Sequence, residues 1–281
     1  MDYYQVDVFS DQVLAGNGLS VVFANRSLEA ELMLKITQEF KQFETIFIFP
    51  PINGQYPVRI FTVQEELYFA GHPIIGAAGL LHKLSAPDRM QLGIEILLGE
   101  RTIKLDSENC GAFFKVTMNQ GQAEHISTLP EAQKREIAPW FSLVQTEISP
   151  DYPLSVVSTG LPYLLVPLRN SLPKVKIVVP DLEKRLTGFG AKFCYFFDPE
   201  TLECRTWDNT GIYEDVATGS AAGPLIAYLV ANGIRNRNQE VILRQGRFLQ
   251  RESLIAGHLT EDNEVLITGS VSLFSQGTIF I

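Results

Sequence analysis

Two segments rich in alanine and glycine, each preceded by a glycine-marked loop, constrain this chain more than any other feature. The first runs from Phe69 to Leu81 and the second from Tyr213 to Leu229. Their equivalent positions, Gly71-His72 and Gly219-Ser220, lie 148 residues apart. We interpret both segments as the start and body of a helix that occurs once in each copy of a duplicated unit.

A helix of such small side chains has room for a close neighbour on several faces. Gly76 and Gly79 in the first segment, and Gly223 in the second, leave little bulk around the helix axis. Each glycine costs about 1 kcal/mol against alanine in a helix interior, so burial must stabilise the helix. The pattern predicts an α+β fold with two pseudo-symmetric lobes, each a curved, mostly antiparallel sheet or barrel around a central helix.

Further matches follow in the same order along the two halves. They relate Ala15–Val22 to Ser158–Val166 at an offset of 142, Glu44–Ile48 to Phe193–Phe197 at 149, and Arg59–Phe61 to Arg205–Trp207 at 146. This order predicts an N-terminal lobe over residues 1–115, completed by a terminal strand at 272–281, and a C-terminal lobe over 116–271. We expect the active site in the cleft between them.

Local patterns predict the elements of the first half. Strands are expected at 2–9, 19–23, 45–49, 58–61, 94–105 and 112–118, with a break at Gly99 in the fifth. Apolar residues recur every four positions from Leu28 to Phe40, which predicts a helix that Ser27 can cap. A second helix is expected from His72 to about Leu84.

Charge and composition exclude several classes of partner and cofactor. The net charge of −9 and pI near 5.0 argue against a nucleic-acid binder. No apolar run reaches the length of a membrane span and no leader pattern begins the chain, so a cytoplasmic protein with no membrane partner is expected. The three cysteines form no Cys-x-x-Cys pair and the four histidines show no ligand spacing, so neither a disulfide framework nor a metal is expected.

The two helix starts are candidate binding groups. First-turn amides and the positive end of a helix dipole attract anions. If the lobes face each other, Gly71 and Gly219 would place such amides around one small carboxylate and around the enolate-like charge that appears when a proton is removed beside it. The alternative is that both glycines only permit tight turns.

Three ionisable residues are candidates for proton transfer, each with a structural alternative. Asp215 lies ahead of the second helix and could donate a proton or cap the turn. His72 could act as an acid or base near its ordinary pKa of about 6.5, or serve as a structural donor. Glu44, whose repeat counterpart is Phe193, lies next to an apolar strand that would raise a carboxyl pKa, although a lone glutamate is usually solvated.

Taken together, these segments resemble the phenazine-biosynthesis PhzF family, whose fold is shared with diaminopimelate epimerase and proline racemase. The resemblance covers nearly the whole chain. It rests on Val6–Phe9 with Gly16–Leu19, Glu44-Thr45, Phe69–Pro73, Ser158–Pro162, Glu214–Ala221 and the final strands through Gly277–Ile281.

The resemblance implies a role for individual residues. Glu44 would be the proton shuttle of an isomerisation, assisted by His72 and Asp215. The substrate-binding groups would be Gly71, Gly219, Ser220, Asn17 and Thr218. It also implies a homodimer. Related epimerases place thiols directly before the two glycines, and Ala70 and Thr218 stand there in this chain, which disfavours a two-thiol racemase or epimerase.

Some positions depart from the family pattern. Val216 follows Asp215 where a proline is usual, Lys41-Gln-Phe43 precedes Glu44 in place of Asn-Leu-Ser, and Val63 stands where a proline is usual. A missing proline gives the segment before Thr218 more freedom, which could move Asp215. These changes alter the surroundings of the site without removing an acid or a glycine.

The resulting hypothesis is a cofactor-independent isomerase that moves a proton within a small unsaturated or cyclic carboxylic acid. Glu44 would take and return the proton, while His72 and Asp215 orient or protonate the substrate. The alternative is a non-catalytic protein that keeps the fold and binds a small molecule or a partner.

Overall fold

The computed structural model describes residues 1–281 and divides into two compact units. Unit 1 comprises residues 1–119, 248–254 and 268–281, and unit 2 comprises residues 120–247 and 255–267. Each unit is described by itself below.

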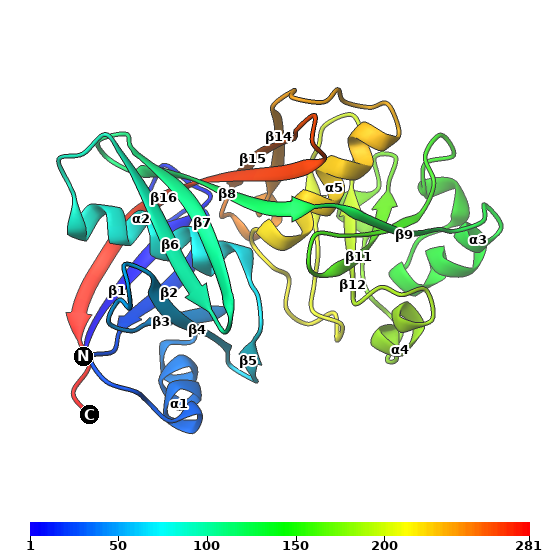
Figure 1. Cartoon of the computed structure of the whole chain (residues 1–281). Helices are drawn as coiled ribbons and strands as arrows, with labels where there is room; N and C mark the ends of the chain where they lie inside the picture. Colours follow the sequence, from blue (N-terminus) through cyan, green and yellow to red (C-terminus); the bar gives the residue numbers. More distant parts are fainter. The chain divides into compact units, whose positions relative to one another are not determined.

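The strands and helices alternate irregularly along the chain (Figure 1). The strands are β1 Asp2–Val8, β2 Asn17–Phe23, β3 Glu44–Ile48, β4 Tyr56–Thr62, β5 Glu66–Leu67, β6 Gln91–Leu98, β7 Arg101–Asn109, β8 Phe114–Gln122, β9 Glu124–Thr128, β10 Ser155–Ser158, β11 Pro162–Pro167, β12 Phe193–Phe197, β13 Cys204–Arg205, β14 Val241–Gln245, β15 Ser253–Leu259 and β16 Glu264–Thr278. The helices are α1 Ala30–Phe40, α2 Gly71–Ser85, α3 Gln133–Ile137, α4 Leu182–Thr187 and α5 Gly219–Ala231, with short 3₁₀ turns η1 Ala138–Phe141, η2 Gln145–Glu147, η3 Leu172–Lys174 and η4 Arg247–Leu249.

Unit 1 is built on a closed barrel. Its strand order is β1-β2-β3-β4-β6-β7-β8-β16, and β16 pairs with β1 to close the ring. All neighbouring pairs with a defined register are antiparallel except β2 with β3 and β4 with β6. Closure leaves no free edge among these eight strands.

Helix α2 is the central helix of this barrel (Figure 1). It packs against β1, β2, β3, β6 and β7, and most of its residues are buried. A Cβ at Gly76 would lie 2.5 Å from Leu19 Cδ2, and one at Gly79 would lie 2.7 Å from Val271 Cβ. The two glycines therefore permit the strands to approach the helix, and the predicted fold class is confirmed for this unit.

Helix α1 covers the outer face of the barrel. Met33 and Ile36 pack with Val22, Phe47 and Phe61 in one apolar cluster. The prediction that Ser27 caps this helix was wrong, because α1 begins at Ala30 with Glu29 as an extended N-cap residue that makes no side-chain cap bond. Leu28 is buried in the same cluster ahead of the helix, and Ser27 lies three residues before the first helical residue, too far to cap it.

Unit 2 contains a five-stranded sheet in the order β13-β12-β11-β10-β9, and α5 packs on β10 and β11. Because side chains alternate along a strand, each strand contributes to both faces. Val156, Leu164 and Phe196 join an apolar cluster with residues of α3, α4 and the 3₁₀ turns. The alternate residues, Tyr163 and Tyr195 among them, point to the opposite face.

The strand registers of the two units support the duplication. Phe47 pairs with Arg59 across β3 and β4, and Phe196 pairs with Arg205 across β12 and β13, which matches the predicted offsets of 149 and 146. The predicted match of Ala15–Val22 with Ser158–Val166, at an offset of 142, was wrong by two residues. Leu19 pairs with Glu44, so its counterpart is Tyr163, which pairs with Phe193, and the offset is 144 in place of 142.

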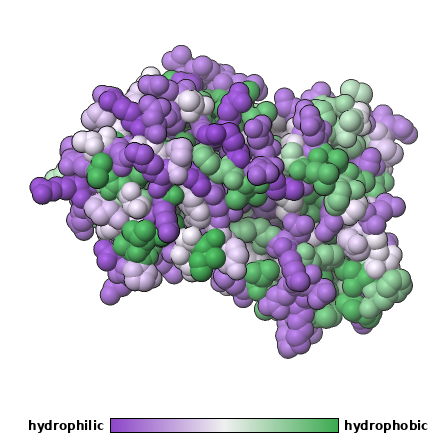
Figure 2. Space-filling view, turned by 180° about the vertical axis from the view of Figure 1, so that it is seen from behind, coloured by the Kyte–Doolittle hydropathy of each residue, from purple (hydrophilic) through white to green (hydrophobic).

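On the face shown in Figure 2, hydrophilic residues predominate and apolar ones form separate patches. No helix combines the length and hydropathy needed to cross a membrane.

Candidate active site

The buried pair Glu44 and His72 is the centre of the candidate site in unit 1. Glu44 begins β3 opposite Leu19, whose side chain contacts the central helix, and His72 is the second residue of that helix. The carboxylate Oε2 lies 2.9 Å from His72 Nδ1, and the residues are only 6% and 5% exposed. Tertiary structure thus places a carboxylate and a histidine in contact although 28 positions separate them.

The pair has unused hydrogen-bonding capacity. Glu44 Oε2 approaches His72 from a direction that does not form a hydrogen bond, and His72 Nε2 also has no hydrogen-bond partner. Buried polar atoms are nearly always paired, so such exceptions call for an explanation. A substrate supplying a donor and an acceptor would satisfy both atoms.

The start of α2 adds backbone donors beside this pair. Gly71 is the first residue of the helix, and the preceding Ala70 supplies no side-chain cap. First-turn amides at such a start suit a carboxylate or a developing enolate. Gly71 directly precedes His72, which contacts Glu44.

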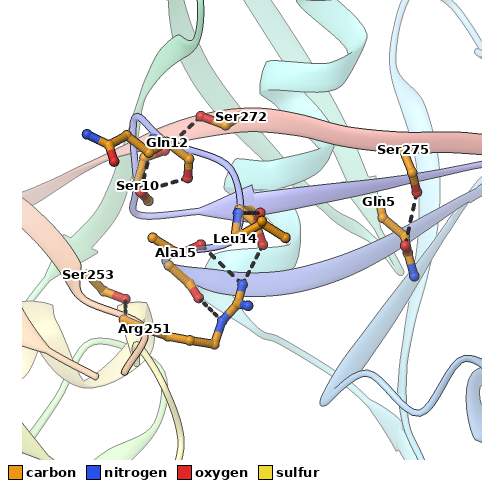
Figure 3. Close-up of polar contacts among 11 residues, drawn as sticks. Gln5, Ser10, Gln12, Leu14, Ala15, Arg251, Ser253, Ser272 and Ser275 are labelled. Atoms are coloured by element: carbon orange, nitrogen blue, oxygen red, sulfur yellow. Dashed lines mark hydrogen bonds and ion pairs between the residues drawn. The ribbon is translucent and has the colours of Figure 1, made fainter. Parts of the chain in front are cut away.

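Asn17 lies in the same unit at the start of β2, and it is 2% exposed. A polar network fixes the loop before it (Figure 3). Arg251 donates to the carbonyl oxygens of Ala15 and Gly16 and to Asp7, whose carboxylate also accepts from the Leu14 amide. Burial raises the pKa of Asp7, while Leu14 and Arg251 oppose that rise.

Unit 2 brings together the other predicted residues. Thr218 is the N-cap residue of α5, and its hydroxyl donates to Asp215 Oδ2 at 2.6 Å. Gly219 and Ser220 open the helix, and the Ser220 hydroxyl lies 2.7 Å from the Tyr163 hydroxyl. Asp215, Thr218, Gly219 and Ser220 therefore form one local group.

Three further residues form hydrogen bonds with this group, and the sequence analysis did not identify them. Gln245 bonds to both ends of the 215–218 segment, Gln120 donates to the Gly219 carbonyl, and Tyr163 contacts Ser220. Tyr163 could have been found, since it lies within a segment that matched the repeat. Gln120 and Gln245 are isolated glutamines in strands, and no local pattern marks them.

The cysteines of this chain do not supply a thiol base. Burial raises the pKa of Cys204 to about 12 and that of Cys194 well above its ordinary value, and Cys110 is exposed at a turn. A neutral buried thiol is a poor proton acceptor at neutral pH. Ala70 and Thr218 stand before the helix glycines, so the two-thiol chemistry of related epimerases has no counterpart here.

Other parts of the structure do not compete with these groups. No three or more His, Cys, Asp or Glu side chains gather in a way that could hold a metal ion. A cavity of about 560 Å³ in unit 2 is lined partly by Tyr228 and Asn232 at the C-terminal end of α5, and none of the candidate residues lines it.

Comparisons with known proteins show the family to which the chain belongs. The family of phenazine biosynthesis-like proteins (PhzC-PhzF) matches residues 6–277. A trans-2,3-dihydro-3-hydroxyanthranilate isomerase from Pseudomonas chlororaphis is 30% identical over 99% of both chains, and an uncharacterised isomerase from Escherichia coli is 28% identical over 95% of this chain and 94% of its own.

Solved structures extend the similarity to the fold. A structure described as a "Predicted Epimerase" from Pseudomonas aeruginosa has a TM-score of 0.95 at 41% identity, covering 100% of this chain and 99% of its own. A probable proline racemase from Agrobacterium radiobacter has a TM-score of 0.61 at 10% identity, covering 100% and 93%, and shares the fold alone. The resemblance seen in the sequence is confirmed: the chain belongs to the phenazine biosynthesis-like protein family and is an isomerase.

Proposed function

We propose that this isomerase moves a proton within a small unsaturated or cyclic carboxylic acid, without a cofactor, by general acid–base catalysis. The observation that carries the proposal is the buried Glu44–His72 pair at the start of α2, with its two unsatisfied polar atoms. A carboxylate held away from water beside free amides suits proton abstraction next to a substrate carboxylate.

In the proposed reaction, Glu44 takes a proton from one carbon of the substrate and returns it to another. One C–H bond breaks, one forms and the double bond moves, so no oxidant or reductant is required. His72 and the Gly71 amide stabilise the charge that develops on the substrate. Asp215, Thr218, Gly219, Ser220 and Asn17 are proposed as further groups that orient or protonate it.

The first substrate to test is trans-2,3-dihydro-3-hydroxyanthranilate, because the Pseudomonas relative carries its name. The protein is incubated in deuterated water with this compound and with a panel of small unsaturated carboxylic acids. Recovered compounds are then analysed by NMR for the moved double bond and for solvent deuterium. General acid–base catalysis typically contributes about 10²- to 10⁴-fold in rate, so Glu44→Gln is expected to lose that much.

A matched control is Glu66→Gln, which changes a partly exposed carboxylate of the same unit paired with Arg59. This variant should retain wild-type turnover. Turnover by Glu44→Gln near the wild-type rate would remove Glu44 as the shuttle. Tight binding across the panel with no exchange would favour the alternative of a binding protein.

The proposal also includes a homodimer, which the family resemblance implies, and a cytoplasmic location, which was expected from the absence of a leader pattern and of a membrane span in the sequence. Sedimentation equilibrium of the purified chain tests the oligomeric state, and a mass of one chain across the concentration range would refute the dimer.

A further inference from the structure

The side-chain amide of Gln245 is saturated with hydrogen bonds. Gln245 ends β14 and is 2% exposed. Its Oε1 accepts from Tyr195 Oη at 2.8 Å and from the Thr218 amide at 3.2 Å, and its Nε2 donates to the Asp215 carbonyl at 2.9 Å and to Thr218 Oγ1 at 3.0 Å. Four bonds are the full capacity of a glutamine amide.

Two backbone groups fix the orientation of this amide. The Thr218 N–H can only donate and the Asp215 carbonyl can only accept, so Oε1 faces Thr218 and Nε2 faces Asp215. Tyr195 is fully buried, and burial raises the pKa of its phenol well above the ordinary value, so the hydroxyl keeps its proton and can donate it to Oε1. Nε2 is then directed to Asp215 and to the Thr218 hydroxyl.

The same amide sets the direction in which the Thr218 hydroxyl donates its hydrogen. Because Thr218 Oγ1 accepts a hydrogen from Gln245, its own hydrogen is available for Asp215 Oδ2, which lies 2.6 Å away. A continuous path of donated hydrogens thus runs from Gln245 through Thr218 to the Asp215 carboxylate.

Gln245 also bonds to both ends of the 215–218 segment, which has no proline to stiffen its backbone. Val216 follows Asp215, so no proline ring fixes the backbone there. The Asp215 amide is bonded to the Thr206 carbonyl, and Gln245 holds the carbonyl of Asp215 and the amide of Thr218. A side chain from β14 therefore restrains both ends of the segment, in addition to the bond between Thr218 and Asp215 within it.

We propose that Gln245 is a positioning residue for the isomerase reaction: through Thr218 it fixes where the Asp215 carboxylate points. This inference rests on the proposed function, in which Asp215 orients or protonates the substrate. A misplacement of about 1 Å in a catalytic group can cost about 10²-fold in rate, so loss of the restraint should lower kcat more than it changes KM.

The kinetic test uses Gln245→Met in the wild-type and Asp215→Asn backgrounds, with trans-2,3-dihydro-3-hydroxyanthranilate as the probe. We expect Gln245→Met to lower kcat about 10- to 100-fold in the wild type, with KM changed less than about threefold. In the Asp215→Asn background it should change kcat less than about threefold. Equal losses in both backgrounds would overturn the inference.

Two further variants guard against a general loss of folding. Tyr195→Phe removes only one bond to Gln245 and is expected to give a smaller loss of kcat of the same kind. Lys134→Met removes another buried polar side chain of unit 2, which donates to the Ser149 carbonyl, and should leave kcat unchanged. A loss of kcat in Lys134→Met equal to that in Gln245→Met would assign the effect to stability and overturn the inference.

A measurement without substrate separates this inference from the proposed function. The ¹³C signal of the Asp215 carboxyl, assigned through Asp215→Asn, should shift at pH 7 in Gln245→Met and in Thr218→Val. The double variant should show no additional shift, because both residues act along one path. Additive shifts would refute the path. If the path holds but Asp215→Asn keeps full kcat, the proposed role of Asp215 fails instead.

Discussion

At the scale of single residues, buried charged groups decide how this protein responds to pH. Asp7 is the clearest case, because it is 5% exposed and its carboxylate holds the loop before Asn17 through Leu14 and Arg251 (Figure 3). Burial is the largest influence on Asp7 and raises its pKa above 3.8. The folded chain therefore binds this proton more tightly than the unfolded chain does.

This raised pKa makes a prediction about stability. The stabilisation from the Asp7 proton is fully present below pH 3.8 and is lost as the pH rises through the raised pKa of the folded state. In Asp7→Asn this component is absent. The free energy of unfolding of the wild type, minus that of the variant, should fall as the pH rises above 3.8, as measured by urea denaturation at each pH. Asp106→Asn, an exposed carboxyl of unit 1, is the control, and a difference that stays level or rises would contradict the prediction.

The candidate catalytic pair shows the same dependence on neighbours. Neither Glu44 nor His72 is unusual for its type in the sequence, and for each residue taken alone the structural alternative was the more common one. Their contact at 2.9 Å, inside a barrel and at a helix start, distinguishes them from a solvated glutamate and a capping histidine. The contact supports the proton-transfer proposal, which the turnover rate of Glu44→Gln tests.

At the scale of elements, α2 depends on the absence of side chains at its contacts with the barrel. A Cβ at Gly79 would lie 2.7 Å from Val271 Cβ and 2.9 Å from both of its methyl groups. Val271 is β-branched and its Cβ cannot move without its strand, so the clash is not relieved by a rotamer change. The glycine is thus required by packing in spite of its low helix propensity.

Gly79→Ala is therefore expected to destabilise the protein. Overpacking typically costs about 1–3 kcal/mol, and the gain in helix propensity of about 1 kcal/mol offsets only part of it. The matched control is Gly93→Ala in β6, where a Cβ would meet nothing within 4 Å. Urea denaturation should show a net loss for Gly79→Ala and a change within about 0.5 kcal/mol for Gly93→Ala. A stabilised Gly79→Ala would mean that the strand moves freely.

At the scale of the whole molecule, the duplication extends to side-chain interactions within each unit. Arg59 lies over the ring of Phe61 and pairs with Glu66, and Arg205 lies over Trp207 and pairs with Glu214. The backbone repeats as well, since Phe61 pairs with Glu66 and Trp207 forms a bridge with Glu214. The two copies differ in burial, because the first ion pair is 33% and 38% exposed and the second 9% and 10%.

This difference predicts unequal costs for equivalent substitutions. Glu214→Gln removes the carboxylate counter-charge of the buried Arg205, which keeps its bond to the Leu172 carbonyl; breaking a buried ion pair in this way typically costs about 3–5 kcal/mol. Glu66→Gln removes a partly exposed pair, which is worth about 0–1 kcal/mol. Unfolding free energies measured for both variants in one buffer should differ accordingly. Equal costs would show that burial does not distinguish the two pairs.

The sequence determined much of the local structure of the first half of the chain and the starts of both small-residue helices. The small-residue segments predicted the starts of α2 and α5, and the offsets of 149 and 146 predicted the strand registers in unit 2. These features follow from helix and strand propensities, from the periodicity of apolar residues and from the sequence repeat, all of which can be recognised in short segments of the chain. The Ser27 cap failed because α1 begins later, at Ala30, and the offset of 142 failed because the true offset is set by the pairing between strands.

Only the tertiary structure decided which side chains meet. Gln245 lies 30 positions from Asp215 and Arg251 lies 244 positions from Asp7, and no local pattern connects either pair. These hydrogen bonds form only when particular strands become neighbours. The order of the strands depends on how the sheet as a whole buries its apolar residues. The sequence named Glu44, His72 and Asp215, and the fold supplied the neighbours that hold them.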